Sequence, residues 1–265
     1  MNAAAIAPKP KRSDLGVRTV TGLALILVAL FAVAWGQTPF WLLLSVAALV
    51  MLAEWASMIA AERWQMWLSF VGLTLALLVE QPHLDIPDVF SPFVLAAAAA
   101  LVAAVTRNLR LAAGMLYAGL PTLSLFFLHG QYDGIDLTLW TLAIVWATDI
   151  GAYFAGRRFG GAKLAPAISP NKTWAGLIGG IAAAGIVGLA LAIMLRLPLR
   201  LAGFGGLLAI AAQAGDLYES AMKRRAGVKD SGAILPGHGG AMDRLDGVVP
   251  VACLVAAIVA SGAIG

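Results

Sequence analysis

The sequence predicts an all-α, polytopic integral membrane protein. Of its 265 residues, 61% are hydrophobic and 12% are charged, whereas a soluble domain carries about 25% charged residues. Apolar stretches of about 18 residues or more, long enough to cross a bilayer as helices, recur from one end of the chain to the other. A β-barrel would alternate apolar and polar residues, and the run at 94–105 does not alternate.

About nine membrane-spanning helices are expected, preceded by a mobile basic arm at residues 1–16. The expected spans are residues 17–35, 39–60, 64–80, 90–106, 111–129, 135–156, 174–195, 199–222 and 247–264. The first span has a rival interpretation as a cleaved signal peptide, because Ala32-Val33-Ala34 looks like a cleavage site. Its apolar run exceeds the roughly 7–15 residues of the hydrophobic region of a signal peptide, which favours a retained helix.

The distribution of basic residues predicts that the N-terminus is cytoplasmic. In that orientation 16 of the 18 Lys and Arg residues fall in cytoplasmic segments, and Arg196 and Arg200 alone lie outside. This is the positive-inside pattern, so the net charge of +4 indicates topology rather than nucleic-acid binding. Two cytoplasmic segments, 157–173 and 223–246, are longer than the other connections, and long polar loops often carry function.

We therefore expect residues 17–130 to be a scaffold and residues 131–265 to form the functional region. Glycines at small-xxx-small spacing in the span at 174–195 predict close helix packing within the chain. The densest cluster of charge is residues 215–246, which hold five acidic and five basic side chains.

The helical half of this cluster places polar side chains on one face. Gln213, Asp216, Ser220 and Lys223 follow one another at helical spacing. Asp216 lies about 10 Å deeper along the helix than Lys223. An ionisable group at membrane depth usually faces a polar cavity and is a functional candidate, although an ion pair with a neighbouring helix is the alternative.

The loop half combines glycines with acids and cations. Its Pro236-to-Gly240 stretch allows the backbone N–H groups to approach an anion, and His238 within it is either structural or a phosphate contact. Asp243 and Asp246 would share one helix face. Carboxylates among cations suit Mg²⁺ bound together with phosphate; helix capping is the alternative, but it needs only one acid. The neighbouring cations are Lys223, Arg224, Arg225, Lys229 and Arg244, of which Arg225 is best explained by contact with lipid headgroups.

A third cluster lies upstream. Asp149 sits in an apolar run, and Ser169, Lys172 and Thr173 come directly before the span at 174–195. A helix N-terminus beside a lysine attracts phosphate, but an ordinary helix cap explains the same residues equally well. For Glu54, near the end of the second span, structural pairing or an interfacial position is favoured.

These polar residues resemble the signature of the phosphatidate cytidylyltransferases, also called CDP-diacylglycerol synthases. The matching pattern is Ser220-x-x-Lys223-Arg224-x4-Lys229-Asp230-x-Gly232-x2-Leu235-Pro236-x-His238-Gly239-Gly240-x-x-Asp243-Arg244-Leu245-Asp246. Two upstream stretches, at 149–153 and 169–173, are similar to further family motifs and lie in the expected order. The family usually has Glu where this chain has Ala175, and a larger aliphatic residue where it has Ala241.

The resemblance implies an all-helical, homodimeric enzyme of the bacterial inner membrane whose active site faces the cytoplasm. It would convert CTP and phosphatidate from the cytoplasmic leaflet into CDP-diacylglycerol and pyrophosphate with Mg²⁺, and a second metal ion is an open possibility. In a mechanism that fits the residues, Asp216, Asp243 and Asp246 are metal ligands and Lys223 is catalytic. The expected substrate-binding residues are Arg224, Lys229, Arg244, His238, Ser220, Lys172, Asp149 and Ser169.

Two other functions stay open at this point. A CTP-dependent kinase of a polyprenol or other lipid alcohol would use similar carboxylates and cations, but it needs a base for a neutral hydroxyl. A lipid or ion transporter would use Asp149 and Asp216 at the membrane midplane. Transporters often contain two related halves, and no such repeat is visible here.

Overall fold

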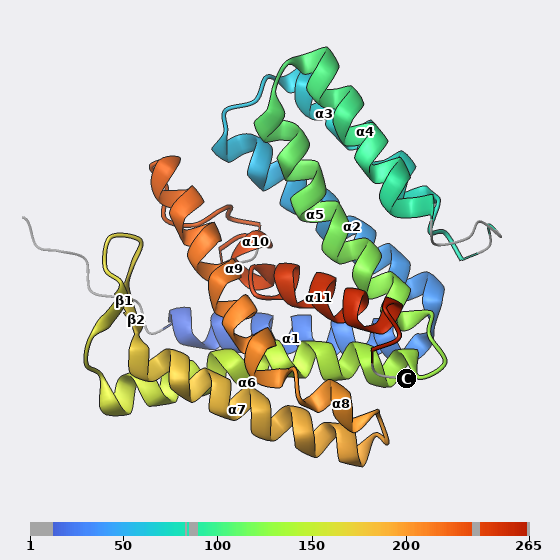
Figure 1. Ribbon diagram of the computed structural model, residues 1–265. Helices are drawn as coiled ribbons and strands as arrows, with labels where there is room; N and C mark the ends of the chain where they lie inside the picture. Colours follow the sequence, from blue (N-terminus) through green and yellow to red (C-terminus); the bar gives the residue numbers. More distant parts are fainter. Residues whose placement is uncertain (1–12, 83, 85–89, 235–238, 264–265) are drawn as a thin grey trace, which may run out of the picture.

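The computed structural model describes residues 13–82, 84, 90–234 and 239–263 and is mainly helical over them (Figure 1). The helices are α1 (Ser13–Trp35), α2 (Gln37–Met58), α3 (Arg63–Leu78), α4 (Ser91–Thr106), α5 (Leu109–His129), α6 (Gly134–Phe159), α7 (Trp174–Met194), α8 (Leu199–Ala202), α9 (Gly205–Arg225), α10 (Met242–Leu245) and α11 (Val248–Ala260). Two strands, β1 (Lys163–Ala165) and β2 (Ser169–Thr173), lie between α6 and α7. Eight of the nine expected spans each coincide with a single helix to within about four residues at either end.

The expected spans differ from the structure at two places. Helix α1 begins at Ser13, so the end of the predicted arm is helical, and residues 1–12 lie outside the described part of the chain. The expected span at 199–222 is two helices. The single turn α8 ends at Ala202, the chain turns at Gly203 and Phe204, and α9 then runs to Arg225, because glycine lowers the helix propensity at the break.

The prediction of an all-α fold is wrong for the segment 157–173, which was expected to be a loop. Helix α6 continues through Arg157 and Arg158, whose positive charges favour the C-terminal end of a helix. The rest of the segment contains an antiparallel hairpin in which Lys163 pairs with Thr173. The strands have three and five residues, too few to show the alternating pattern that predicts a strand.

The helices pack around two hydrophobic cores. One core lies among α2, α3, α4 and α5, and it includes Met242 of α10, which is fully buried. The other lies among α1, α6, α7, α9 and α11. Figure 1 shows α6 and α7 side by side along the bottom of the view, and α11 contacts both α5 and α9. The α9–α11 pair therefore joins the two halves of the chain.

Helices α6 and α7 form the closest helix pair, as the glycine spacing predicts. A Cβ atom added at Gly151 of α6 would lie 2.5 Å from the Cβ of Ala183 in α7, and one at Gly180 would lie 2.9 Å from the carbonyl oxygen of Thr148. Side chains at these positions would push the two backbones apart. The glycines therefore pack within the chain, as predicted.

Several of the described helices have the length and surface of membrane spans. Four are long and apolar enough to cross a bilayer, namely α2, α5, α6 and α7, and shorter apolar helices occupy Val20–Trp35, Ser91–Thr106 and Val248–Ala260. Large apolar side chains such as Phe93 and Ile186 are about 70% exposed. Apolar surface of this extent requires a nonpolar surrounding, so the chain is an integral membrane protein.

Candidate active site

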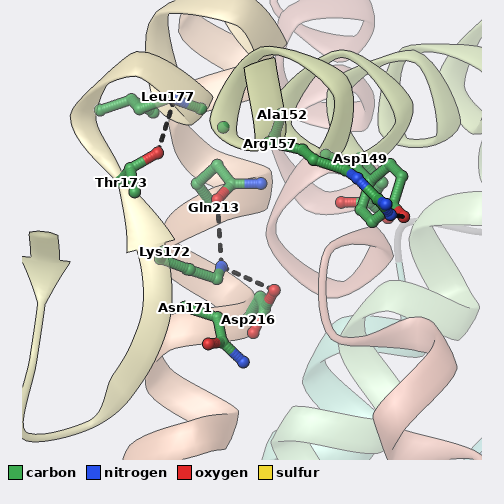
Figure 2. A pocket seen from close by; sticks show the side chains of 12 residues that line it. Asp149, Ala152, Arg157, Asn171, Lys172, Thr173, Leu177, Gln213 and Asp216 are labelled. Atoms are coloured by element: carbon green, nitrogen blue, oxygen red, sulfur yellow. Dashed lines mark hydrogen bonds and ion pairs between the residues drawn. The ribbon is translucent and has the colours of Figure 1, made fainter. Parts of the chain in front are cut away.

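A polar cavity of about 480 Å³ lies between α6, β2, α7 and α9 (Figure 2). This volume is within the usual range for small-molecule sites. Its polar lining consists of Asp149, Tyr153, Arg157, Asn171, Lys172, Thr173, Gln213 and Asp216. The cavity therefore brings together Asp149, Lys172 and Asp216, which the sequence analysis singled out in three separate segments.

Lys172 lies at the centre of this cavity. Its Nζ atom is 2.6 Å from Oδ2 of Asp216 and donates a hydrogen bond of 3.0 Å to Oε1 of Gln213 (Figure 2). The next residue, Thr173, accepts a hydrogen bond of 3.0 Å from the N–H of Gly176 and so caps the N-terminus of α7. The helix cap that the sequence suggested for this segment is therefore confirmed at Thr173, and it fixes the strand end that carries Lys172.

A second group of charges surrounds Lys223 near the end of α9. Its Nζ atom lies 2.5 Å from Oδ1 of Asp243 and 2.7 Å from Oε2 of Glu219. Glu219 is 1% exposed, and the side chain of Asp243 is 5% exposed. One lysine therefore contacts two buried carboxyl groups, and this cluster holds α10 against α9.

The Asp243 carboxylate is itself an anion bound by a backbone N–H at the end of the glycine-rich stretch. Its Oδ2 accepts hydrogen bonds from the N–H of Gly240 at 2.8 Å, and from the N–H and hydroxyl of Ser231 at 2.9 and 3.0 Å. Burial alone would raise the pKa of Asp243, but the hydrogen bonds from Lys223 and Gly240 outweigh it and hold the pKa at about 2. Asp243 is therefore ionised at neutral pH.

Glu54 of α2 anchors the same loop from the N-terminal half of the chain. Its carboxylate accepts hydrogen bonds from the N–H groups of Ala241 and Met242 at 2.8 and 2.9 Å, and it lies 2.9 Å from the Ser231 hydroxyl. A Cβ atom at Gly240 would lie 2.5 Å from both carboxylate oxygens, so a glycine is needed there. The favoured expectation of structural pairing for Glu54 is confirmed, and the region 17–130 contributes directly to the loop.

Asp246 lies close to Asp216 across the contact between α9 and the start of α11. Burial first, then the negative charge of Asp216, raises the pKa of Asp246 to about 7, and its Oδ1 accepts a 2.7 Å hydrogen bond from the N–H of Gly247. The contact is tight at Gly215, where an added Cβ would collide with the carbonyl oxygen of Asp246 and lie 2.9 Å from Pro250.

Two of the acids that were expected to meet have different partners in the structure. Asp216 pairs with Lys172, whereas Asp243 pairs with Lys223. Within the part of the chain that the structure describes, no three acidic, histidine or cysteine side chains form a group able to hold a metal. The expected cluster of three carboxylates, with Asp246 as the third, is therefore not assembled in these residues, because each of the first two acids has its own lysine.

The other predicted site residues surround these two groups. The Ser220 hydroxyl donates a 3.3 Å hydrogen bond to Asp216, and the Arg224 side chain reaches the carbonyl oxygen of Ile168 at 3.5 Å. Lys229 and Arg244 are exposed. Ser169 pairs with Ala165 in the hairpin, and His238 lies outside the described residues.

The sequence analysis did not single out four polar residues of this region as site candidates. Arg157 and Asn171 line the cavity, and Glu219 and Ser231 belong to the groups around Lys223 and Asp243. Arg157 donates a 2.8 Å hydrogen bond to the Tyr153 hydroxyl. Glu219 lies three residues after Asp216 within the expected span at 199–222, so the cost of a charge at membrane depth, the signal used for Asp149 and Asp216, applied to Glu219 as well.

The fold and the site together define an integral membrane protein with a cationic and acidic cavity suited to phosphorylated substrates. The chain matches the Cytidylyltransferase family over residues 16–261. It is 40% identical over 259 residues to the phosphatidate cytidylyltransferase of Brucella suis biovar 1 (strain 1330), with 92% of each chain covered.

Two other relatives extend this comparison. The phosphatidate cytidylyltransferase of Rickettsia bellii (strain RML369-C) is 30% identical over 253 residues, covering 92% of this chain and 90% of that one. The same enzyme of Staphylococcus aureus (strain COL) is 46% identical over 125 residues, which are 46% of this chain. The protein therefore belongs to the cytidylyltransferase family.

Proposed function

We propose that this protein transfers the cytidylyl group of CTP to phosphatidate, giving CDP-diacylglycerol and pyrophosphate. The observation that carries the proposal is the cavity that joins Asp149, Lys172 and Asp216 from three distant segments of a chain in this family. Its cations suit phosphate groups, and its place in a membrane protein suits a lipid substrate.

In the proposed reaction a phosphate oxygen of phosphatidate attacks the α-phosphorus of CTP. A new P–O bond forms, the bond between the α-phosphorus and the bridging oxygen breaks, and pyrophosphate leaves with that electron pair. The nucleophile is already anionic, so the main barrier is repulsion between two phosphates, which positioned cations reduce. Lys172 and Arg157 line the cavity and are proposed for this task. Lys223, which lies on α9 beyond Asp216, is proposed to assist them.

Further cations and polar side chains would bind the substrates around the mouth of the cavity. Arg224, Lys229 and Arg244 are proposed to neutralise the triphosphate and the lipid phosphate as they enter. Ser220 and Ser169 are proposed to contribute hydrogen bonds, and His238 a phosphate contact. Charge-assisted hydrogen bonds of this kind are about twice as strong as neutral ones.

The donor set suits Mg²⁺ that is shared with the substrate phosphates. Magnesium is usually held by one or two carboxylates, with waters and phosphate oxygens completing its shell. Asp216 is the most accessible candidate, since its side chain is 32% exposed at the cavity, and Asp246 lies near it. Asp243 would join them only after exchanging the Lys223 contact, which would free that lysine for a phosphate. When bound, the ion supplies charge neutralisation of the phosphates and the leaving group.

The proposed setting is a bacterial inner membrane, with nine spans, a cytoplasmic N-terminus and the site facing the cytoplasm. The distribution of basic residues supports this orientation. In Figure 1 the hairpin and the start of α1 lie at the left, and the end of α11 lies at the right. We also propose a homodimer, which cross-linking in membranes would test.

The reaction is tested with purified protein, phosphatidate and CTP carrying label in either the α or the γ phosphate. The α-label is expected to enter the lipid and the γ-label to leave in pyrophosphate. Transfer of γ-label to a lipid alcohol would instead identify a kinase. Asp216→Asn and Asp243→Asn are each expected to abolish Mg²⁺-dependent product formation. Activity retained by either folded variant would remove that residue from the proposed metal shell.

A further inference from the structure

A second cavity lies on the other side of α9 from the candidate active site. Its volume is about 430 Å³, and it is bounded by the C-terminal ends of α2 and α9 and the N-terminal end of α5. It contains two exposed arginines, Arg110 and Arg225. Trp55, Met58 and Met222 provide an apolar wall. A cavity with cations and apolar walls suits an amphipathic anion.

An apolar groove continues from this cavity along α5, α9 and α11. The groove also measures about 430 Å³, and it shares Ala113 and Tyr218 with the arginine cavity. Its lining is mainly apolar and runs past Leu120 and Pro121 to Cys253. The two cavities together therefore offer a charged end and an apolar end, as a phospholipid requires.

Aromatic side chains stand where the two cavities join. The ring centroid of Tyr117 lies 5.1 Å from that of Trp55 and 5.8 Å from that of Tyr218. The Tyr117 hydroxyl is buried, and within the described residues it has no hydrogen-bond partner. Buried polar groups normally have partners, so this hydroxyl has an unused hydrogen-bonding capacity near the boundary between the charged and apolar ends.

The arginine cavity does not share the face of α9 that carries the reaction. Tyr218 and Arg225 are two and nine residues after Asp216, which places them about 180–200° around the helix from it. Asp216 and Gln213 face the cavity of Lys172. A phosphate held by Arg225 is therefore separated from Asp216 by the helix itself and cannot be the reacting one.

We propose that the arginine cavity and its groove bind a non-substrate bilayer phospholipid with an anionic phosphodiester headgroup. The phosphate lies between Arg110 and Arg225, the Tyr117 hydroxyl donates to an ester oxygen, and an acyl chain fills the groove. Two guanidinium groups match the charge and the oxygens of a phosphate. The site is independent of the proposed reaction chemistry, and its occupant ties α5 to α9.

The test measures binding without CTP, so its outcome is separate from that of the proposed function. Native mass spectrometry of the delipidated protein compares phosphatidylglycerol with phosphatidylcholine of the same acyl chains. The wild type is expected to prefer phosphatidylglycerol, and R110Q/R225Q to lose roughly tenfold or more of that preference, at about 1 kcal/mol for each arginine. R63Q/R107Q removes two other exposed basic residues and is the matched control. Y117F should weaken binding a few-fold.

An unchanged preference in R110Q/R225Q, with folding verified by thermal melting, would overturn the proposal. An equal loss of preference in the control would also overturn it, because the effect would then be general surface charge. A third arm loads phosphatidate and adds CTP. If the lipid lost in R110Q/R225Q is the one that CTP converts, the cavity is the substrate site and the assignment to a non-substrate lipid is wrong.

Discussion

Glu54 lies in the N-terminal half of the chain, and removal of its carboxylate is expected to impair the candidate active site in the C-terminal half. In Glu54→Ala the buried N–H groups of Ala241 and Met242 lose their acceptor, whereas the Ser231 hydroxyl can still donate to Asp243. An unsatisfied buried donor costs about 1–3 kcal/mol, so two cost about 2–6 kcal/mol. Ala241 and Met242 lie directly before Asp243, so the loss of their hydrogen bonds is expected to displace Asp243 from its position in the site.

The smallest of these costs corresponds to a loss of about 30-fold in turnover, if it is expressed fully in the site. The assay measures kcat and KM for CTP, together with hydrogen exchange of the amides at residues 239–245. Faster exchange in that loop is expected in Glu54→Ala, and Glu54→Gln should lose less because its carbonyl oxygen still accepts one bond. Glu62→Ala, an exposed acid beyond the end of α2, is the control.

A Glu54→Ala protein with wild-type kcat and wild-type hydrogen exchange at residues 239–245 would contradict this role of Glu54. A general loss of stability would accelerate exchange throughout the helices as well. A specific role requires that the effect be concentrated in the loop.

Three further predictions concern the cavity and its borders. Lys172→Met should lower kcat/KM by at least about tenfold, since it removes one charge-assisted contact, and Lys172→Arg should restore part of it; equal activity of all three proteins would exclude a role for the charge. Because the pKa of Asp246 is raised to about 7, its proton is bound more tightly in the folded protein. The stability of the metal-free protein should therefore fall as pH rises from about 4 to about 7, and thermal melts of Asp246→Asn should lack that slope. Ala175→Glu, which introduces the usual family residue, should leave the rate of CDP-diacylglycerol formation intact or raise it, and a severalfold loss would contradict this.

Much of the fold was predictable from sequence because the apolar runs are long and the loops are short. Eight expected spans match single helices, since uninterrupted hydrophobicity fixes both the element and its approximate length. The breaks at Gly203 and in 157–173 were missed. Each depends on local contacts or on strands too short to leave a pattern in the sequence.

The sequence predicted which residues belong to the site better than it predicted which acid pairs with which lysine. Asp149 and Asp216 were recognised because charge is costly in an apolar chain, and Lys172 because it precedes a helix N-terminus; all three line one cavity. Sequence spacing could not show that Asp243 would be paired with Lys223, twenty residues away. The choice between two lysines for two acids depends on how α9 is turned relative to its neighbours, which no local pattern encodes.

The close contact at Gly215 determines how near α9 lies to Asp246, independently of the charged residues of the site. The backbone of α9 touches the carbonyl of Asp246 at this glycine. The absence of a side chain at position 215 therefore allows α9, which carries Asp216, to approach Asp246 closely. A single methyl group at position 215 would wedge the two walls apart while leaving every acid and cation in the sequence. The proposed metal shell would then be lost by steric means alone.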